Sequence, residues 1–488
     1  MAQSSLLVET PEAPRRGIVL IAAAILAMLA LYLLNGGSRF PALVIIGLAA
    51  AMVVYKAAAY TRVDRQWLIV PLVVLSIFIN SFFLQGAPRA AVHYVLVVLL
   101  CAPCVPFVWR EGIFRRGGFQ LYSIYFVWAL ITVIYSLAPQ FSILRLADAV
   151  LIFCAVSAMA YGVKEPDDLT RLVERFLIGC GVFVIILAFA AVALPRSLTW
   201  DVPELYTVNQ QVERFRGLLN SPNDVGVLML ATVSPTLAFW NRFERRKKKW
   251  FAAIALLAVA ECGLADSRTP FIALAMGCAL YVLWRYRLRG VVLMAGAAAV
   301  LIAALPVFGH HLSEYTGRGD VTTLTGRTEM WAYVVGQIRN HPLTGYGYEV
   351  AGAIFKSKYF PIWYGPWEEG SQSSLHNGYL NHAIGVGIPA TLFWLFIVLR
   401  PSWFAMRQKE DPWNLKPLVL LVVVPCLIHN MSEASVGDFL GLIGLLFGFV
   451  WAVGERYRLL VLEQPATERQ KALDQMPPVV AMFQSIKA

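Results

Sequence analysis

Apolar runs close to the length of a bilayer span follow one another along most of the chain, with short polar loops between them. A helix that crosses the hydrocarbon core needs about 20 mostly apolar residues, and a soluble core of this size has no need of such runs in series. The pattern predicts an all-α fold, a polytopic transmembrane helix bundle with about 11–14 spans. The predicted spans lie near residues 17–34, 42–55, 67–84, 91–108, 119–137, 143–163, 176–194, 225–239, 250–264, 270–284, 291–308, 378–399, 418–428 and 439–453.

One long polar interval interrupts this pattern between residues 309 and 376. A helix is predicted inside it, because apolar residues recur at helical spacing at Met330, Trp331, Val334, Val335 and Ile338. Thr325 can cap the start of this helix, and Pro342 ends it because proline has no backbone N–H to donate. We therefore expect one large loop outside the bilayer that contains short helices.

The distribution of basic residues orients the chain. Most of the 41 lysines and arginines fall in alternate loops, and the positive-inside rule places those loops in the cytoplasm. Both termini are then cytoplasmic and the polar interval faces outward. The predicted segments are a cytoplasmic N-terminus (1–16), a first part of the transmembrane bundle (17–308), a large outer loop (309–376), the last spans (377–454) and a polar cytoplasmic tail (455–488).

Composition supports a membrane protein and argues against nucleic-acid binding. Hydrophobic residues make up 58% of the chain and charged residues 15%, whereas a soluble protein averages about 25% charged residues. The net charge of +11 would suit nucleic acid. Because the basic runs lie in short cytoplasmic loops, however, they are explained as topological signals and need no ligand.

Four polar features are predicted on the outer face, at residues 213–223, 266–269, 326–328 and 376–377. A single arginine at a membrane interface is most often an anchor whose charged end reaches the headgroups. The outer face is otherwise poor in basic residues, so several arginines there favour binding of phosphate oxygens, for which the guanidinium group is a permanently charged fork. The candidate side chains are Arg214, Arg216, Arg268, Arg327, His376 and Asn377.

His376 is the candidate general base. A histidine at the entrance of a span is usually a hydrogen-bonded interfacial residue, yet neutral imidazole is also the side chain best suited to accept a proton near neutral pH. His382 is expected on a different side of the helix, and the pair His310–His311 lacks acidic and cysteine neighbours. Neither arrangement has the spacing of a metal site, so no metal is expected.

Several common motifs are absent from the sequence. The chain has no phosphate-binding glycine-rich loop that ends in Lys-Ser or Lys-Thr, no Asp-x-Asp pair for a nucleotide-sugar metal, and no Gly-x-Ser-x-Gly elbow. An enzyme that works outside the cell without nucleotide or metal needs a donor that is already activated on a lipid.

Six polar motifs follow one another in the second half of the chain: Arg216-Gly217, Pro222-Asn223, Ser267-Arg268, Gly326-Arg327-Thr328-Glu329-Met330-Trp331, Asn340-His341-Pro342-Leu343-Thr344-Gly345-Tyr346-Gly347 and His376-Asn377-Gly378-Tyr379-Leu380. Taken in order, they resemble the motifs of the O-antigen ligase and polymerase superfamily of bacterial integral membrane proteins. The similarity covers roughly residues 214–394 and is closest to the exopolysaccharide-polymerase branch. Ser221 departs from the family, whose members often have asparagine before Pro-Asn.

The resemblance implies a metal-independent, inverting transfer of a glycan from undecaprenyl diphosphate, without a cofactor. In this scheme His376 is the general base, and Arg268 and Arg327 bind the diphosphate and stabilise the charge that develops on it. The predicted substrate-binding residues are Arg214, Arg216, Asn377 and Tyr379. A diphosphate leaving group needs positive charge rather than a proton, so this division of roles is also chemically sound.

The resemblance places the protein in the bacterial inner membrane with a periplasmic active site. Its expected partners are the lipid-linked glycan donor, a glycan acceptor, the lipid bilayer and, as further candidates, other polysaccharide-assembly proteins. We rank a polymerase of lipid-linked repeat units first and a ligase that transfers a finished glycan to lipid A core or protein second. A flippase or other transporter ranks third, because transporters place their polar residues near the middle of the membrane.

Overall fold

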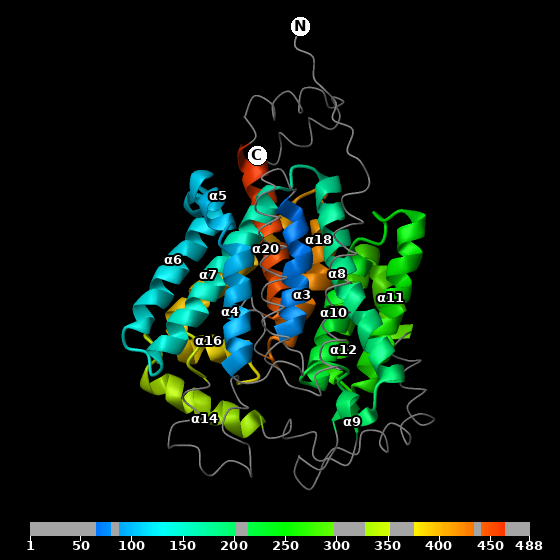
Figure 1. Ribbon diagram of the computed structural model, residues 1–488. Coiled ribbons are helices and arrows are strands. Elements are labelled where there is room, and N and C mark those ends of the chain that lie inside the picture. Colours follow the sequence, from blue (N-terminus) through cyan, green and yellow to red (C-terminus); the bar gives the residue numbers. More distant parts are fainter. Residues whose placement is uncertain are drawn as a thin grey trace, which may run out of the picture.

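Long helices lie side by side in a bundle in the computed structural model, which describes residues 65–79, 87–201, 213–296, 327–351, 375–433 and 441–463 (Figure 1). The bundle confirms the predicted all-α membrane fold. The elements up to residue 238 are η1 (Arg65–Leu68), α3 (Ile69–Ile79), α4 (Ala87–Cys101), α5 (Cys104–Arg110), η2 (Ile113–Arg115), α6 (Gly117–Val133), α7 (Pro139–Tyr161), α8 (Pro166–Ala193), α9 (Arg196–Thr199), the strands β1 (Trp200–Asp201) and β2 (Arg214–Phe215), and α10 (Pro222–Ala238). They are followed by α11 (Arg245–Leu264), α12 (Arg268–Tyr286), α14 (Arg327–Asn340), α16 (Gly378–Val386), α17 (Ile388–Arg407), α18 (Leu415–Leu418), η5 (Val419–Val423), α19 (Val424–His429) and α20 (Leu442–Glu463).

The predicted spans coincide with helices wherever the structure describes them. Within the described ranges, four helices, α7, α8, α12 and α17, are long and apolar enough to cross a membrane, and α4 with α5 would be a fifth as one bent span. That pair bends by 40° where Pro103, which has no N–H to donate, precedes α5. The predicted spans 17–34 and 42–55, and most of 291–308, lie outside the described residues.

Aromatic side chains fill the core where α6, α7, α17 and α20 meet. The ring of Trp451 on α20 lies 5.0 Å from that of Tyr122 and 5.3 Å from that of Phe119, both on α6. Trp394 on α17 donates its indole N–H to the Tyr122 hydroxyl at 3.0 Å. Within a bilayer, apolar burial alone does little to join helices, so close packing and such interhelical hydrogen bonds hold the bundle together.

The predicted span 378–399 is two helices rather than one. α16 ends at Val386 and α17 begins at Ile388, and Gly387 between them has a φ of 84° that favours glycine. The loop 342–348 lies against this break and binds both sides of it through the backbone pairs Tyr346 N–Ile384 O (2.9 Å), Gly347 N–Gly385 O (2.8 Å) and Ile388 N–Pro342 O (2.8 Å). The hydropathy pattern shows a single apolar run over these residues. It does not reveal the break, because the break is stabilised by the loop 342–348 and not by its own sequence.

The helix over residues 415–429 contains a π-helical segment, η5, between α18 and α19. Pro425 in the first turn of α19 has no N–H to donate, and its ring would meet the Leu421 carbonyl in a regular α-helix. The wider turn of a π-helix accommodates such a residue. The helix then ends at His429, so this irregular segment determines how the residues after it are oriented.

α14 confirms the helix predicted inside the polar interval. It ends at Asn340, shortly before Pro342, and its apolar stripe packs with Leu375 and Ile384. In Figure 1 it lies across the lower end of the bundle. Met330, Val334 and Ile338 are buried, whereas Val335 is exposed.

The predicted tail 455–488 begins as a continuation of α20, which runs to Glu463. Glu455 is fully buried, and it accepts the N–H of Gly118 at 2.6 Å and the guanidinium Nε of Arg458 at 3.0 Å. These contacts satisfy a carboxylate that would otherwise be costly to bury. The polar composition of this segment therefore gave no sign that its first part is a packed helix end. Residues 464–488 lie outside the described part of the chain.

Candidate functional site

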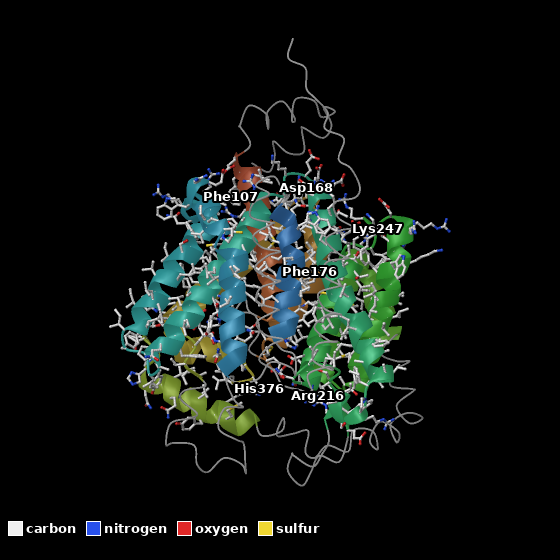
Figure 2. All side chains as sticks on the ribbon, viewed as in Figure 1. Phe107, Asp168, Phe176, Arg216, Lys247 and His376 are labelled. Atoms are coloured by element: carbon white, nitrogen blue, oxygen red, sulfur yellow. The ribbon has the colours of Figure 1, made fainter. Side chains whose placement is uncertain are left out.

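The candidate residues lie at one end of the bundle. Figure 2 shows His376 and Arg216 at this end and Asp168 and Lys247 toward the opposite end. α14 crosses the same end as His376 (Figure 1). We refer to the end that carries His376 and Arg216 as the site end.

His376 is fixed by contacts on both sides of it in the chain. Its φ is 49°, an uncommon value for a residue with a side chain. Trp331 donates its indole N–H to Leu375 O at 3.0 Å, and Gly378 N donates to Asn430 O at 2.8 Å. A backbone strained in this way persists only where its surroundings determine it. α14 and the end of α19 together therefore set the position of the imidazole.

Glu433 forms an imidazole–carboxylate pair with His376. The Glu433 Oε2 atom lies 2.7 Å from His376 Nδ1, and the two side chains are 19% and 32% exposed. A carboxylate that accepts Nδ1–H leaves the imidazole lone pair on Nε2 and stabilises the imidazolium that forms when Nε2 takes a proton. Glu433 was not predicted from the sequence. The available signal was the polar segment 430–433 directly after an apolar run.

Asn223 joins Glu433 to a second part of the site. Its Nδ2 donates to Glu433 Oε1 at 3.1 Å, and its Oδ1 accepts from Arg214 Nη2 at 3.2 Å. Local sequence places it at the start of α10, where Ser221 Oγ accepts the Asn223 N–H at 3.1 Å and Pro222 occupies the first turn. Both are regular features of a helix N-terminus.

Arg214 holds the turn between α11 and α12. It lies on β2, where it pairs with Asp201 of β1. Its Nε donates to Ala265 O at 3.0 Å and its Nη2 to Asp266 O at 3.2 Å, in addition to the contact with Asn223. Two of its nitrogen atoms are thus engaged with the protein, and the side chain acts as a clamp on the turn.

Arg268 begins α12 immediately after this turn. Its Nε lies 3.4 Å from Asp266 Oδ1, and its Nη2 is buried without a hydrogen-bond partner among the described residues. The side chain as a whole is 38% exposed. A buried charged donor without an acceptor is costly, so the geometry favours an anionic ligand on Arg268. Asp266 has a φ of 45°, a strained value of the kind found at functional turns.

The remaining predicted arginines, Arg216 and Arg327, lie on different elements. Arg216 follows β2, is half-buried, and donates its backbone N–H to Thr199 O at 2.9 Å. Arg327 is the first residue of α14. Because Trp331 of the same helix is bonded to the residue before His376, α14 carries the backbone of Arg327 toward the base.

Asn377 and Tyr379, which were predicted to bind substrate, make contacts within the protein. The Asn377 side chain caps α16 by accepting the Leu380 N–H at 3.0 Å. The Tyr379 hydroxyl donates to Leu427 O at 2.8 Å and so ties α16 to α19. Both contacts help to fix the helix that follows His376.

The arrangement combines a base with cationic groups on separate elements. The hydrogen bonds run from His376 through Glu433, Asn223 and Arg214 to the turn that precedes Arg268. Such a site can remove a proton from a hydroxyl while a guanidinium neutralises an anionic leaving group. Among the described residues, no group of three or more histidine, cysteine, aspartate or glutamate side chains is placed to hold a metal ion.

Comparison with known proteins shows that part of this region is similar to a family model. Residues 253–395 match the family model described as O-antigen ligase. This stretch extends from α11 into α17 and contains Arg268, Arg327 and His376, whereas Arg214, Asn223 and Glu433 lie outside it. No curated protein matches the chain.

Proposed function

We propose that this chain, of which residues 253–395 match the O-antigen ligase family model, is a multi-pass membrane enzyme that uses lipid-linked glycans and acts as a polysaccharide polymerase. It joins oligosaccharide repeat units that are linked to undecaprenyl diphosphate, at the periplasmic face of the bacterial inner membrane. The observation that carries the proposal is the His376–Glu433 pair, 2.7 Å apart, in one hydrogen-bonded chain with the turn before Arg268.

In the proposed reaction, His376 Nε2 takes the proton of an acceptor sugar hydroxyl. The hydroxyl oxygen then attacks the anomeric carbon of the donor glycan, and the bond from that carbon to the diphosphate breaks. Undecaprenyl diphosphate leaves with the electron pair, and attack from the opposite face inverts the anomeric configuration. Base catalysis of this type is worth on the order of 10² to 10⁴ in rate.

Arg268 and Arg327 bind the diphosphate in this scheme, with Arg216 as a further contact. Guanidinium groups match phosphate oxygens in geometry and keep their charge at all relevant pH values. The Arg268 Nη2 atom, which is buried and has no acceptor within the described part of the chain, supports this role for Arg268. Glu433 holds the Nδ1–H tautomer and stabilises the imidazolium until the proton passes to solvent.

The proposed orientation places the site end in the periplasm. Lys247 lies toward the opposite end of the bundle from His376 (Figure 2), within a strongly basic segment at residues 245–249. Such segments are retained in the cytoplasm. Both termini are proposed to be cytoplasmic as well.

A ligase is the second candidate, favoured by the description of the matching family model. A ligase would use the same donor site and the same base but transfer the finished glycan to lipid A core or to a protein. The polymerase ranks first because the motifs resemble the exopolysaccharide-polymerase branch. The two functions differ in the acceptor, and the products distinguish them.

Transfer from a synthetic undecaprenyl-diphosphate glycan to a second such molecule, with purified protein in lipid vesicles, tests the proposal directly. Wild-type protein should lengthen the glycan, and His376→Ala should abolish product with protein level and thermal stability unchanged. His341→Ala is a matched control, since His341 is an exposed histidine beyond the end of α14. Near-normal product from His376→Ala would overturn the assignment of the base.

Sizing the lipid-linked glycan in a gene-deletion strain distinguishes the two candidates. A strain that lacks a polymerase accumulates single repeat units, because nothing joins them. A strain that lacks a ligase accumulates long lipid-linked chains. Long chains in the deletion strain would therefore replace the polymerase with the ligase.

A further inference from the structure

Asn223 lies between the two halves of the proposed site and bonds to both with its side-chain amide. Its two donor–acceptor contacts are complementary: the NH₂ group donates to Glu433 Oε1 (3.1 Å), and the carbonyl oxygen accepts from Arg214 Nη2 (3.2 Å). A side-chain amide is neutral and can donate to a carboxylate through its NH₂ group while it accepts from a guanidinium through its oxygen. A carboxylate in its place would face Glu433, and an aliphatic residue would bond to neither partner.

Each neighbour of Asn223 has a separate task. Glu433 uses its other oxygen, Oε2, to hold the imidazole of His376 at 2.7 Å. Arg214 uses Nε and Nη2 to hold the carbonyl oxygens of Ala265 and Asp266. The amide therefore connects the orientation of the base to the geometry of the turn that leads into Arg268.

We infer that Asn223 is a positioning residue that couples the donor-binding turn 265–268 to the general base His376, with Arg214 as the clamp on the turn. This inference rests on the proposed glycan transfer. Neither residue touches the reacting atoms. Asn223 acts through Glu433, and Arg214 acts through the turn on one side and through Asn223 on the other.

The inference predicts different kinetic effects for the two residues. Asn223→Ala leaves Glu433 with one contact fewer, so kcat should fall about tenfold, in keeping with the loss of a hydrogen bond to a charged group. The turn keeps both carbonyl contacts to Arg214, so the donor KM should stay within about twofold. Arg214→Ala releases the turn, so the donor KM should rise and kcat should fall as well.

An isosteric variant separates positioning from simple helix stability. Asn223→Asp keeps the oxygen that accepts from Arg214 and fits the same volume at the start of α10. It removes the donor to Glu433 and places two carboxylates together, so kcat should fall at least as far as in Asn223→Ala. Thr236→Ala is the control, because it removes a buried hydrogen bond within α10, to Thr232 O at 2.7 Å, far along the helix from Asn223. Its kcat should remain within about twofold of the wild-type value.

The decisive experiment is a double-mutant cycle measured on the full-length protein in lipid vesicles with the synthetic undecaprenyl-diphosphate glycan. If Arg214 influences the base only through Asn223, Arg214→Ala should lower kcat less in the Asn223→Ala background than in the wild-type background, and the loss that remains comes from the released turn before Arg268. Its effect on donor KM should persist in both backgrounds. Additive losses of kcat, or unchanged kcat in Asn223→Ala or Asn223→Asp, would overturn the coupling.

Failure of this inference is distinguishable from failure of the proposed function. Wild-type protein that transfers no glycan refutes the proposed function. Wild-type protein that transfers glycan, together with an Asn223→Asp variant of full kcat, refutes the positioning role alone.

Discussion

Trp331 donates its indole N–H to the carbonyl oxygen of Leu375 at 3.0 Å, one residue before His376. This bond links the helix that begins with Arg327 to the histidine, although 44 positions in the sequence separate Trp331 from Leu375. The proposed base and the helix that begins with Arg327 are therefore linked by a contact between α14 and the segment that precedes α16.

Replacing Trp331 with phenylalanine should keep most of the packing of α14 and remove this hydrogen bond. We expect kcat to fall about three- to tenfold, since a neutral hydrogen bond contributes about 0.5–1.5 kcal/mol. Steady-state transfer assays measure this change. Val335→Ala is the control, because Val335 is 38% exposed on the same helix. Equal kcat in Trp331→Phe and wild-type protein would show that the bond does not position the base.

Glu433→Gln should lower kcat by about 100-fold with little effect on expression or donor KM. The amide has the size of the carboxylate but lacks the charge that stabilises the imidazolium, and its NH₂ group cannot accept the Nδ1–H. Single-turnover measurements on vesicle-reconstituted protein report the chemical step. Met431→Ala, at an exposed position of the same segment, should behave as wild type. A Glu433→Gln variant with normal kcat would remove Glu433 from the proposed mechanism.

Arg268→Lys should raise the donor KM about tenfold or more and lower kcat. An ammonium keeps the charge but loses the planar fork that matches diphosphate oxygens. Arg327→Lys should lose activity for the same reason. Titration with the lipid-linked donor measures both effects, with the exposed Arg339→Lys on α14 as the control. Full activity of both lysine variants would indicate that these arginines only anchor the protein at the interface.

Gly345→Ala should lower the thermal stability of the protein and its activity together. Gly345 has a φ of 65°, and a Cβ atom there would overlap Gly385 O at the break between α16 and α17. Strain of this kind costs about 1–3 kcal/mol. Gly336→Ala is a matched control, since a Cβ there meets nothing within 4 Å in α14. That change should stabilise the helix by about 0.5–1 kcal/mol. Equal unfolding temperatures for the two variants would contradict the proposed role of the loop.

The sequence predicted the elements whose signals are local. The apolar runs predicted the helices of the bundle, and the spacing of Met330, Val334 and Ile338 predicted α14. The break at Gly387 could not be predicted in this way, because it is stabilised by the loop 342–348 rather than by its own neighbours. Glu455 was assigned to a polar tail, because its partners Gly118 and Arg458 are visible only once α6 and α20 are packed together.

The contacts within the candidate site could be predicted only in part for the same reason. His376 and the arginines stood out as polar residues on an apolar background. Glu433 did not, because its pairing with His376 depends on how α19 ends beside α16, 57 positions away in the sequence. The sequence also could not show that the two arginines differ. Arg214 donates to a protein carbonyl, whereas the Nη2 atom of Arg268 has no protein acceptor among the described residues.

The π-helical segment η5 sets the rotation, about the helix axis, of the residues that follow it. Each residue of an α-helix turns the chain by about 100°. If the residues Val419–Val423 formed a regular α-helix with none of them removed, everything after them would be rotated by roughly that amount. Asn430 would then leave the Gly378 N–H, and Glu433 would leave the imidazole, although every side chain of the site was still present. The surroundings of His376 thus depend on the rotational phase of a buried helix turn that contains no polar residue.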